Sequence, residues 1–199
     1  MKGMLKLGIV LALYATAACV GLAFVYSATS ETIAVRQQAD LEAALRELFP
    51  EGDDFTDITG TIASPDPAVA FETQYAVRKG TALIGAAIQA SAASYGGILK
   101  VLVGVGADGR ISRVKILEHQ DTPGLGANAG SPTYYVDKSK KITFYGQFAG
   151  KSVQDPFEVK GDVVAITASS ITSRAVTSAV KASGDAASAW LAPQTGGAQ

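Results

Sequence analysis

The sequence GGILKVLVGVGADGRISRVKIL, residues 96–117, contains the clearest indication of secondary structure in the chain. It contains two runs rich in β-branched and aliphatic residues, 96–105 and 110–117, joined by a short glycine-containing link. This pattern predicts a β-hairpin. The link also matches the G-x-G-x-x-G pattern of dinucleotide sites, but such a site needs a helix after the turn, and a second strand follows here. We therefore interpret these glycines as turn residues.

Towards the C-terminus, the run VVAI (163–166) predicts another strand, followed by a hydroxyl-rich turn and a helix over about 171–182. Apolar residues recur in this helix at the spacing of one buried face. The predicted buried stripe consists of Ile171, Ala175, Val176, Ala179 and Val180.

Upstream of the hairpin, residues 31–48 predict an amphipathic helix that starts after Ser30 and ends before Pro50. Its apolar positions follow the i, i+3, i+4, i+7 spacing and are Leu41, Ala44, Leu45 and Leu48. The segment 51–67 is polar and acid-rich and is interpreted as a connector.

The N-terminal part of the chain predicts a membrane anchor. Residues 7–26 contain no charge and no proline, and twenty helical residues span about 30 Å, which matches the hydrocarbon core of a bilayer. Lys2 and Lys6 precede the span and an acid-rich stretch follows it, so the N-terminus is expected in the cytoplasm. A cleaved signal peptide and a lipoprotein modified at Cys19 are the alternatives.

These elements together predict an α+β protein with a single N-terminal transmembrane helix followed by a mixed α/β domain. The expected parts are a cytoplasmic N-terminus (1–6), the transmembrane helix (7–26), a helical and acidic connector (27–67), the folded domain (68–192) and a flexible tail (193–199). The protein is expected in the inner membrane as a single-pass protein, with its soluble domain on the periplasmic or extracellular side.

Composition excludes several classes of function. The 199 residues include 17 Lys and Arg against 18 Asp and Glu, so no excess of positive charge is available for nucleic acid. One Cys and one His cannot build a Cys/His zinc site or a disulfide framework. The segment Gly146–Ser152 resembles a phosphate loop, but it has three residues between its glycines instead of four.

The segment ITASSITSRAV, residues 166–176, places five hydroxyl side chains where a strand is expected to lead into a helix. Free amide groups and the helix dipole make such a position suitable for a phosphate. Helix capping by Ser and Thr is the simpler explanation.

This segment resembles the flavinylation motif, Ser/Thr-Gly-Ala-Thr/Ser, of the FMN-binding domain family. That family includes the G subunit of the Rnf electron-transport complex and the C subunit of the Na+-translocating NADH:quinone reductase. Here the motif stands as Thr167-Ala168-Ser169-Ser170, followed by Ile171-Thr172-Ser173. The resemblance implies a covalently bound FMN, which a flavin transferase attaches through its phosphate to Ser170.

A second stretch, Glu118-His119-Gln120-Asp121-Thr122-Pro123-Gly124-Leu125-Gly126, is similar to the acidic-Thr-Pro-Gly-Leu-Gly loop that lies against the isoalloxazine ring in that family. Gln147, Phe148 and Lys151, between the two motifs, agree with the resemblance. Besides Ser170, the implied cofactor-binding residues are Thr122, Gly124, Leu125, Gly126, Thr167, Ser169 and Thr172.

The sequence departs from the family pattern at three places. Ala168 and Ser169 replace the Gly and the Ala of the motif, and Val164 stands where an acidic residue is common. Alanine disfavours positive φ, which glycine adopts freely.

The resemblance implies an electron-relaying subunit of an ion-translocating ferredoxin:NAD oxidoreductase, which passes electrons between redox centres and transforms no free substrate. Its partners would be other membrane, iron-sulfur and flavin subunits, and no nucleic acid. Three alternatives remain open: a subunit of the quinone reductase, a scaffolding subunit without flavin, and a serine hydrolase that uses Ser170 and His119.

Overall fold

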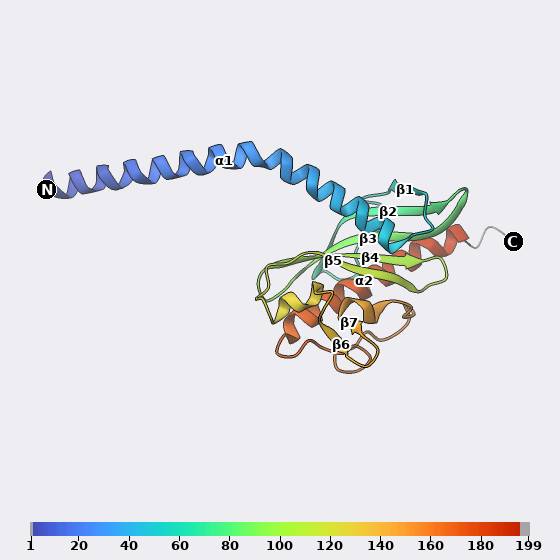
Figure 1. The fold of residues 1–199 in the computed structure, drawn as a ribbon. Coiled ribbons are helices and arrows are strands. Elements are labelled where there is room, and N and C mark those ends of the chain that lie inside the picture. The colour runs from blue at the N-terminus through green and yellow to red at the C-terminus, as the bar shows by residue number, and fades with distance from the viewer. Residues whose placement is uncertain (1, 196–199) are drawn as a thin grey trace. The chain divides into compact units, whose positions relative to one another are not determined.

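The computed structural model describes residues 2–195 (Figure 1). The chain divides into two compact units, one up to Glu42 and one from Ala43 onward. Helix α1, Lys2–Leu48, forms the first unit and continues into the second. The second unit holds a sheet, several short elements and a second long helix. The α+β class and the single long apolar helix at the N-terminus are thus confirmed.

The first unit is a helix with an apolar surface. α1 is long and apolar enough to cross a membrane. Large apolar side chains along it are exposed, among them Leu7, Ile9, Leu11, Leu13, Leu22 and Phe24. Such a surface is stable in lipid and not in water.

The prediction of a separate helix beginning after Ser30 was wrong, because α1 continues through this position. The Ser30 hydroxyl donates to the carbonyl of Ser27, 3.4 Å away within the same helix. A hydroxyl that bonds back to a preceding carbonyl does not cap a new helix.

The second unit is built on a five-stranded antiparallel sheet in the order β1-β2-β3-β4-β5. The order in space follows the order in the sequence, so each strand turns back beside the previous one. The strands are β1 (Asp54–Asp57), β2 (Val69–Lys79), β3 (Ala82–Ala93), β4 (Ile98–Gly106) and β5 (Ile111–Glu118). The predicted hairpin is confirmed as β4 and β5, and the glycine link between them is a turn.

Helix α2, Ser170–Thr195, packs on β3 and β4 and covers one face of the sheet (Figure 1). The main core lies between them. The strands contribute fully buried residues at alternating positions, as expected for one face of a sheet: Ala86, Ile88, Ala90, Val101, Val103 and Val105. In the predicted stripe of α2, Ala175, Val176, Ala179 and Val180 are buried, whereas Ile171 is 48% exposed.

The C-terminal end of α1 is held on the opposite face of the sheet. Phe49 lies against Gly85 and Gly104, where an added Cβ would come within 2.9 Å of its ring. The hydroxyl of Ser112 donates to the carbonyl of Leu48 at 2.7 Å, and an Arg113 nitrogen donates to the carbonyl of Glu47 at 3.0 Å. Side chains of β5 thus satisfy carbonyls at the helix end, which have no partner within the helix.

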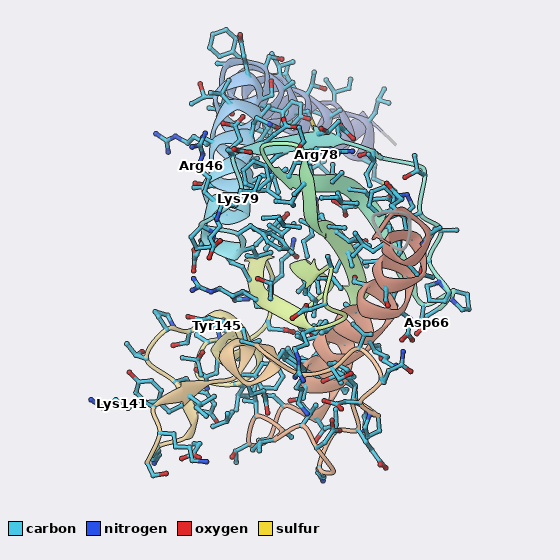
Figure 2. All side chains as sticks on the ribbon, turned by 90° about the vertical axis from the view of Figure 1, so that its right-hand side faces the viewer. Arg46, Asp66, Arg78, Lys79, Lys141 and Tyr145 are labelled. Atoms are coloured by element: carbon cyan, nitrogen blue, oxygen red, sulfur yellow. The ribbon has the colours of Figure 1, made fainter. Side chains whose placement is uncertain are left out.

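The predicted polar connector contains β1, which pairs with β2. The turn after β2 is tied to this segment by a 2.7 Å ion pair between Glu51 and Lys79, which is labelled in Figure 2, and by two bonds from the Gly80 N–H to the Asp53 carboxylate. The acidic residues of this segment therefore have local structural partners.

Between β5 and α2 the chain forms only short elements: η1 (Gly126–Gly130), β6 (Tyr135–Asp137), β7 (Ile142–Thr143) and η2 (Tyr145–Phe148). The prediction of a strand over 163–166 was wrong, because Val163 makes one isolated bridge to Val159 and no ladder follows. At the C-terminus α2 continues through residue 195, and residues 196–199 of the expected tail lie outside the described part.

Candidate functional site

The segment before α2 is held by side chains in place of a strand partner. The Gln147 amide bonds both backbone groups of Val164, accepting from its N–H at 2.8 Å and donating to its carbonyl at 3.1 Å. The buried Ser173 hydroxyl accepts from the Ile166 N–H at 3.0 Å and donates to the Ser169 carbonyl at 2.9 Å. These bonds satisfy the peptide groups that a ladder would otherwise occupy, which explains the missing strand.

The turn into α2 retains a left-handed residue. Ala168 has a φ of 59°, a conformation that glycine adopts at little cost and alanine at a higher cost. The following carbonyl, that of Ser169, accepts from the Ser173 N–H at 3.0 Å, so Ser169 is the N-cap and Ser170 the first residue of α2. The N–H groups of this first turn have no intrahelical acceptor.

The loop after β5 is anchored by a buried carboxylate. Asp121 is 6% exposed and accepts from the Ser94 hydroxyl and from the Gly96 N–H, each at 2.6 Å. The Ser94 hydroxyl also lies 3.2 Å from the Thr172 hydroxyl on α2. One small polar network thus joins the β3–β4 turn, the loop after β5 and the first turn of α2.

The two predicted motifs meet at Gly126. A Cβ added there would lie 2.6 Å from the Thr172 hydroxyl oxygen and 2.7 Å from the Asp121 side chain. Only a residue without a side chain allows the loop to approach α2 this closely. Two segments about 45 residues apart in sequence therefore form one surface.

This surface encloses a cavity of about 490 Å³, a volume within the usual range for small-molecule sites. Of the predicted residues, Thr122, Leu125, Gly126, Ser169, Ser170 and Thr172 line it. The other lining residues are Tyr95, Asp121, Ala168 and Ile171. Leu125, Ile171 and Tyr95 are 43%, 48% and 74% exposed, so the mouth of the cavity is apolar.

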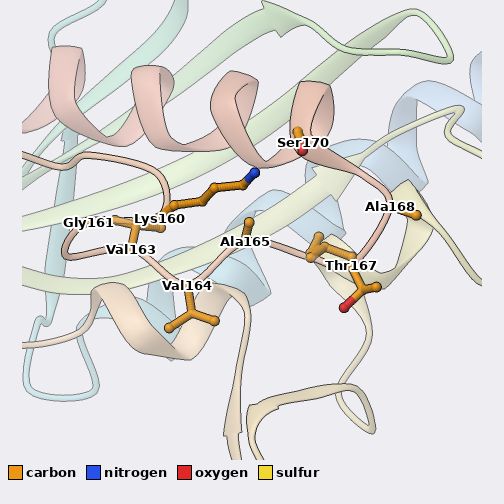
Figure 3. Close-up of a pocket in the computed structure, with 9 residues that line it drawn as sticks. Lys160, Gly161, Val163, Val164, Ala165, Thr167, Ala168 and Ser170 are labelled. Carbon is orange, nitrogen blue, oxygen red and sulfur yellow. The ribbon is translucent and has the colours of Figure 1, made fainter.

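Two predicted residues do not line this cavity. Gly124 has a φ of 78° and shapes the loop, and its carbonyl accepts from the Asn128 amide at 2.9 Å. Thr167 lines a neighbouring cavity of about 420 Å³ together with Ser170 and Lys160 (Figure 3). Tyr95 was missed, because nothing in the local sequence of a β-turn shows which distant loop it faces.

The other residues that the sequence suggested for cofactor binding or catalysis have structural roles or lie away from Ser170. Phe148 is fully buried, with its ring centroid 6.3 Å from that of Phe157. Lys151 forms a 2.7 Å ion pair with Asp162. The lysine of the segment that resembles a phosphate loop is therefore paired with a carboxylate. His119 does not line the cavities around Ser170, and its buried Nδ1 has no hydrogen-bond partner, so the structure shows no Ser–His pair.

The residues around the cavity suit a flavin mononucleotide. The side chains of Leu125 and Ile171, both partly exposed at the mouth of the cavity, offer apolar contact for a flat ring. The hydroxyls of Thr122, Ser169, Ser170 and Thr172, with the free N–H groups of the first turn of α2, offer donors for a phosphate. Both kinds of surface lie in one cavity.

Comparison with known proteins agrees with this chemistry. The sequence model described as the FMN-binding domain matches residues 94–184, and the one described as the RnfG N-terminal region matches residues 1–48. The chain is 33% identical over 166 residues to the G subunit of the proton-translocating ferredoxin:NAD(+) oxidoreductase complex of Clostridium ljungdahlii, covering 80% of this chain and 78% of that protein.

Two further relatives are similar over most of their length. The G subunit of the Na(+)-translocating ferredoxin:NAD(+) oxidoreductase complex of Acetobacterium woodii is 31% identical over 199 residues, with 92% of this chain and 90% of that protein covered. The G subunit of the ion-translocating oxidoreductase complex of Aliivibrio fischeri is 31% identical over 192 residues, with 89% and 87% covered.

Proposed function

Because the chain belongs to the family of G subunits of ion-translocating, Rnf-type oxidoreductase complexes, we propose that it relays electrons through an FMN esterified to Ser170. The observation that carries this proposal is the single cavity that Ser170 shares with the Thr122–Gly126 loop. Two motifs with separate expected roles, phosphate attachment and ring contact, need to lie this close for one cofactor to reach both.

Bound FMN supplies the capacity to accept and release one or two electrons. The chain's own residues hold and surround it. Ser170 provides the hydroxyl for the phosphate ester, and the first turn of α2 offers N–H donors beside it. Leu125 and Ile171 would contact the ring and exclude water from it, while Gly126 lets the loop that carries Leu125 pack closely against Thr172 and Asp121.

The position of Ser170 supports its choice over Ser169. Ser169 is 8% exposed, whereas Ser170 is half-buried and also lines the adjoining cavities of about 420 and 350 Å³. A hydroxyl that must react in the active site of a flavin transferase has to be accessible. We expect the transferase to act on Ser170 from this open side.

The left-handed turn at Ala168 also favours flavinylation over a scaffolding subunit without flavin. The family motif has glycine at this place, and Ala168 retains the conformation that glycine would give. The change from Gly to Ala therefore leaves the path of the backbone towards Ser170 intact.

The chain is a membrane protein, with α1 as its apolar helix. We propose that it crosses the membrane once, with the N-terminus in the cytoplasm and the FMN-binding domain on the outer side. Its partners in this proposal are the other subunits of the complex, which carry the neighbouring iron-sulfur and flavin centres. Ferredoxin and NAD are the outer electron donor and acceptor, as in the names of its relatives.

The test is covalent labelling in cells that also express a flavin transferase. The denatured chain should fluoresce in a gel, and peptide mass mapping should find the FMN adduct on Ser170. Ser170→Ala should abolish the adduct and leave a folded protein, since Ser169 and not Ser170 is the N-cap of α2, and even loss of an N-cap costs only about 0.5–2 kcal/mol. Ser169→Ala and Ser170→Thr should retain it. An adduct on Ser169, Thr167 or Thr172, or none at all, would contradict the assignment.

A further inference from the structure

A positively charged side chain approaches Ser170 from a loop outside the two flavin motifs. Lys160 lines both smaller cavities beside Ser170, those of about 420 and 350 Å³. Figure 3 shows its side chain extending towards the first turn of α2, where Ser170 lies. Arg174, one turn along α2, lines the second of these cavities together with Lys160 and Ser170.

The loop that carries Lys160 is held in a fixed, strained form. Lys160 has a φ of 73°, which is uncommon for a residue with a side chain. Asp162 braces the loop by accepting from Lys151 at 2.7 Å and from the Glu158 N–H at 2.5 Å. Strained backbone that is maintained in this way tends to occur at functional sites.

Lys160 and Arg174 are also available for a ligand. Neither forms an ion pair within residues 2–195, whereas the lysines at 79, 100, 115, 151 and 181 all do. One carboxylate, that of Glu158, lines the cavity that the two cations share. The cluster therefore has two positive charges and one negative charge, a net of about +1 next to Ser170.

We propose that Lys160 and Arg174 form a cation pair that binds the phosphate of the flavin at Ser170. A flavin ester on a serine hydroxyl carries one negative charge on its phosphate, which matches the net charge of the cluster. Charge-assisted hydrogen bonds are stronger than neutral ones, so the pair selects the phosphorylated flavin over the unphosphorylated vitamin. This inference rests on the proposed flavin site at Ser170.

The experiment compares FMN with riboflavin on the full-length chain carrying Ser170→Ala, which cannot form the ester. Binding is followed by quenching of flavin fluorescence in detergent solution. FMN should bind at least roughly tenfold more tightly than riboflavin, since hydrogen bonds to charged groups exceed neutral ones by about that factor. When Lys160→Gln or Arg174→Gln is introduced into the Ser170→Ala chain, FMN binding should weaken several-fold and riboflavin binding should stay unchanged. Lys160→Arg, which keeps the positive charge, should retain the preference.

Lys138→Gln is the matched control, because Lys138 is an exposed lysine that lines none of the cavities around Ser170. It should leave both affinities unchanged. The FMN preference should also shrink at high salt in the parent chain, and it should shrink less in the Lys160→Gln variant, where only Arg174 remains, because salt screens exposed charges. Equal melting temperatures across the variants would exclude a folding defect.

The outcomes separate this inference from the proposed function. A preference for FMN that Lys160→Gln and Arg174→Gln leave intact overturns the cation pair while the flavin site stands. If neither flavin binds the Ser170→Ala chain, the phosphorus-31 resonance of the ester on the wild-type chain decides. A shift of that resonance in both variants and not in Lys138→Gln supports the pair, and an unshifted resonance overturns it. A wild-type chain that gains no flavin at all overturns both proposals.

Discussion

Ala168 has a backbone conformation that is unfavourable for a residue with a Cβ atom. Its φ of 59° lies in the left-handed region, where an L-residue with a Cβ is less stable than glycine by about 1–2 kcal/mol. The conformation persists because the bonds of Ser173 to Ile166 and Ser169 hold both sides of the turn. The turn is therefore dictated by its surroundings and not by residue 168.

Ala168→Gly should raise the free energy of unfolding by up to about 1.6 kcal/mol. The strain of about 1–2 kcal/mol is removed, and the greater freedom of glycine in the unfolded chain takes back about 0.4–1 kcal/mol. Denaturant unfolding of the full-length chain in detergent measures the difference. The control is Ala149→Gly, since Ala149 has a φ of −60° and should lose about 0.4–1 kcal/mol. A loss of stability in Ala168→Gly would contradict the strain.

The loop around Asp162 is an element held by one carboxylate. Burial of Asp162 raises its pKa, but hydrogen bonds from Lys151 and from the Glu158 N–H outweigh this, so the net pKa is lowered from 3.8. A carboxyl whose pKa is lower in the folded state stabilises the fold above its unfolded pKa. This stabilisation is lost as the pH falls below about 4 and through the folded pKa.

Asp162→Asn should therefore destabilise the protein by roughly 1–3 kcal/mol at pH 7, the cost of losing hydrogen bonds to a charged group. The difference between the variant and the wild type should shrink as the pH is lowered from 5 to 2. Unfolding curves measured across this pH range test it. Asp185→Asn is the control, because the ion pair of Asp185 within the described residues is the i,i+4 pair with Lys181, and its loss should cost about 0.2–0.5 kcal/mol. A difference independent of pH would argue against an ionised Asp162.

At the scale of the whole molecule, an apolar helical unit and a sheet-based unit have opposite solvent requirements. The exposed apolar side chains of α1 require lipid, whereas the FMN-binding domain has its own core between α2 and the sheet. The positive charges of Lys2 and Lys6 precede the apolar run, which favours retention of that end in the cytoplasm.

Single-cysteine labelling tests this orientation. Cys19 is the only cysteine, so a Cys19→Ala chain provides the background. In cells with a permeabilised outer membrane, a membrane-impermeant maleimide should label Lys138→Cys, which lies on the domain surface. Gly3→Cys should react only after lysis. Labelling of Gly3→Cys alone in unlysed cells would reverse the topology and place the flavin inside the cell.

The features that depend on neighbouring residues could be predicted from the amino-acid sequence. The uncharged run 7–26 specified an apolar helix, the two β-rich runs around a glycine link specified the β4–β5 hairpin, and the two motifs specified the flavin family. Each depends on a periodicity or a spacing within about twenty residues, which the sequence displays directly.

The other features depend on contacts between distant segments, so they became visible only in the folded chain. The run VVAI has strand-forming residues, yet Gln147 and Ser173 take its hydrogen bonds and no neighbouring strand is available. Ile171 fits the apolar stripe of α2 but lies at the mouth of the cavity, beyond the edge of the core. Lys160 belongs to no recognisable sequence motif. It lines a cavity together with Ser170 because Asp162 braces the strained loop that contains it. Periodicity tells which residues share a face of one element, and only packing tells what that face meets.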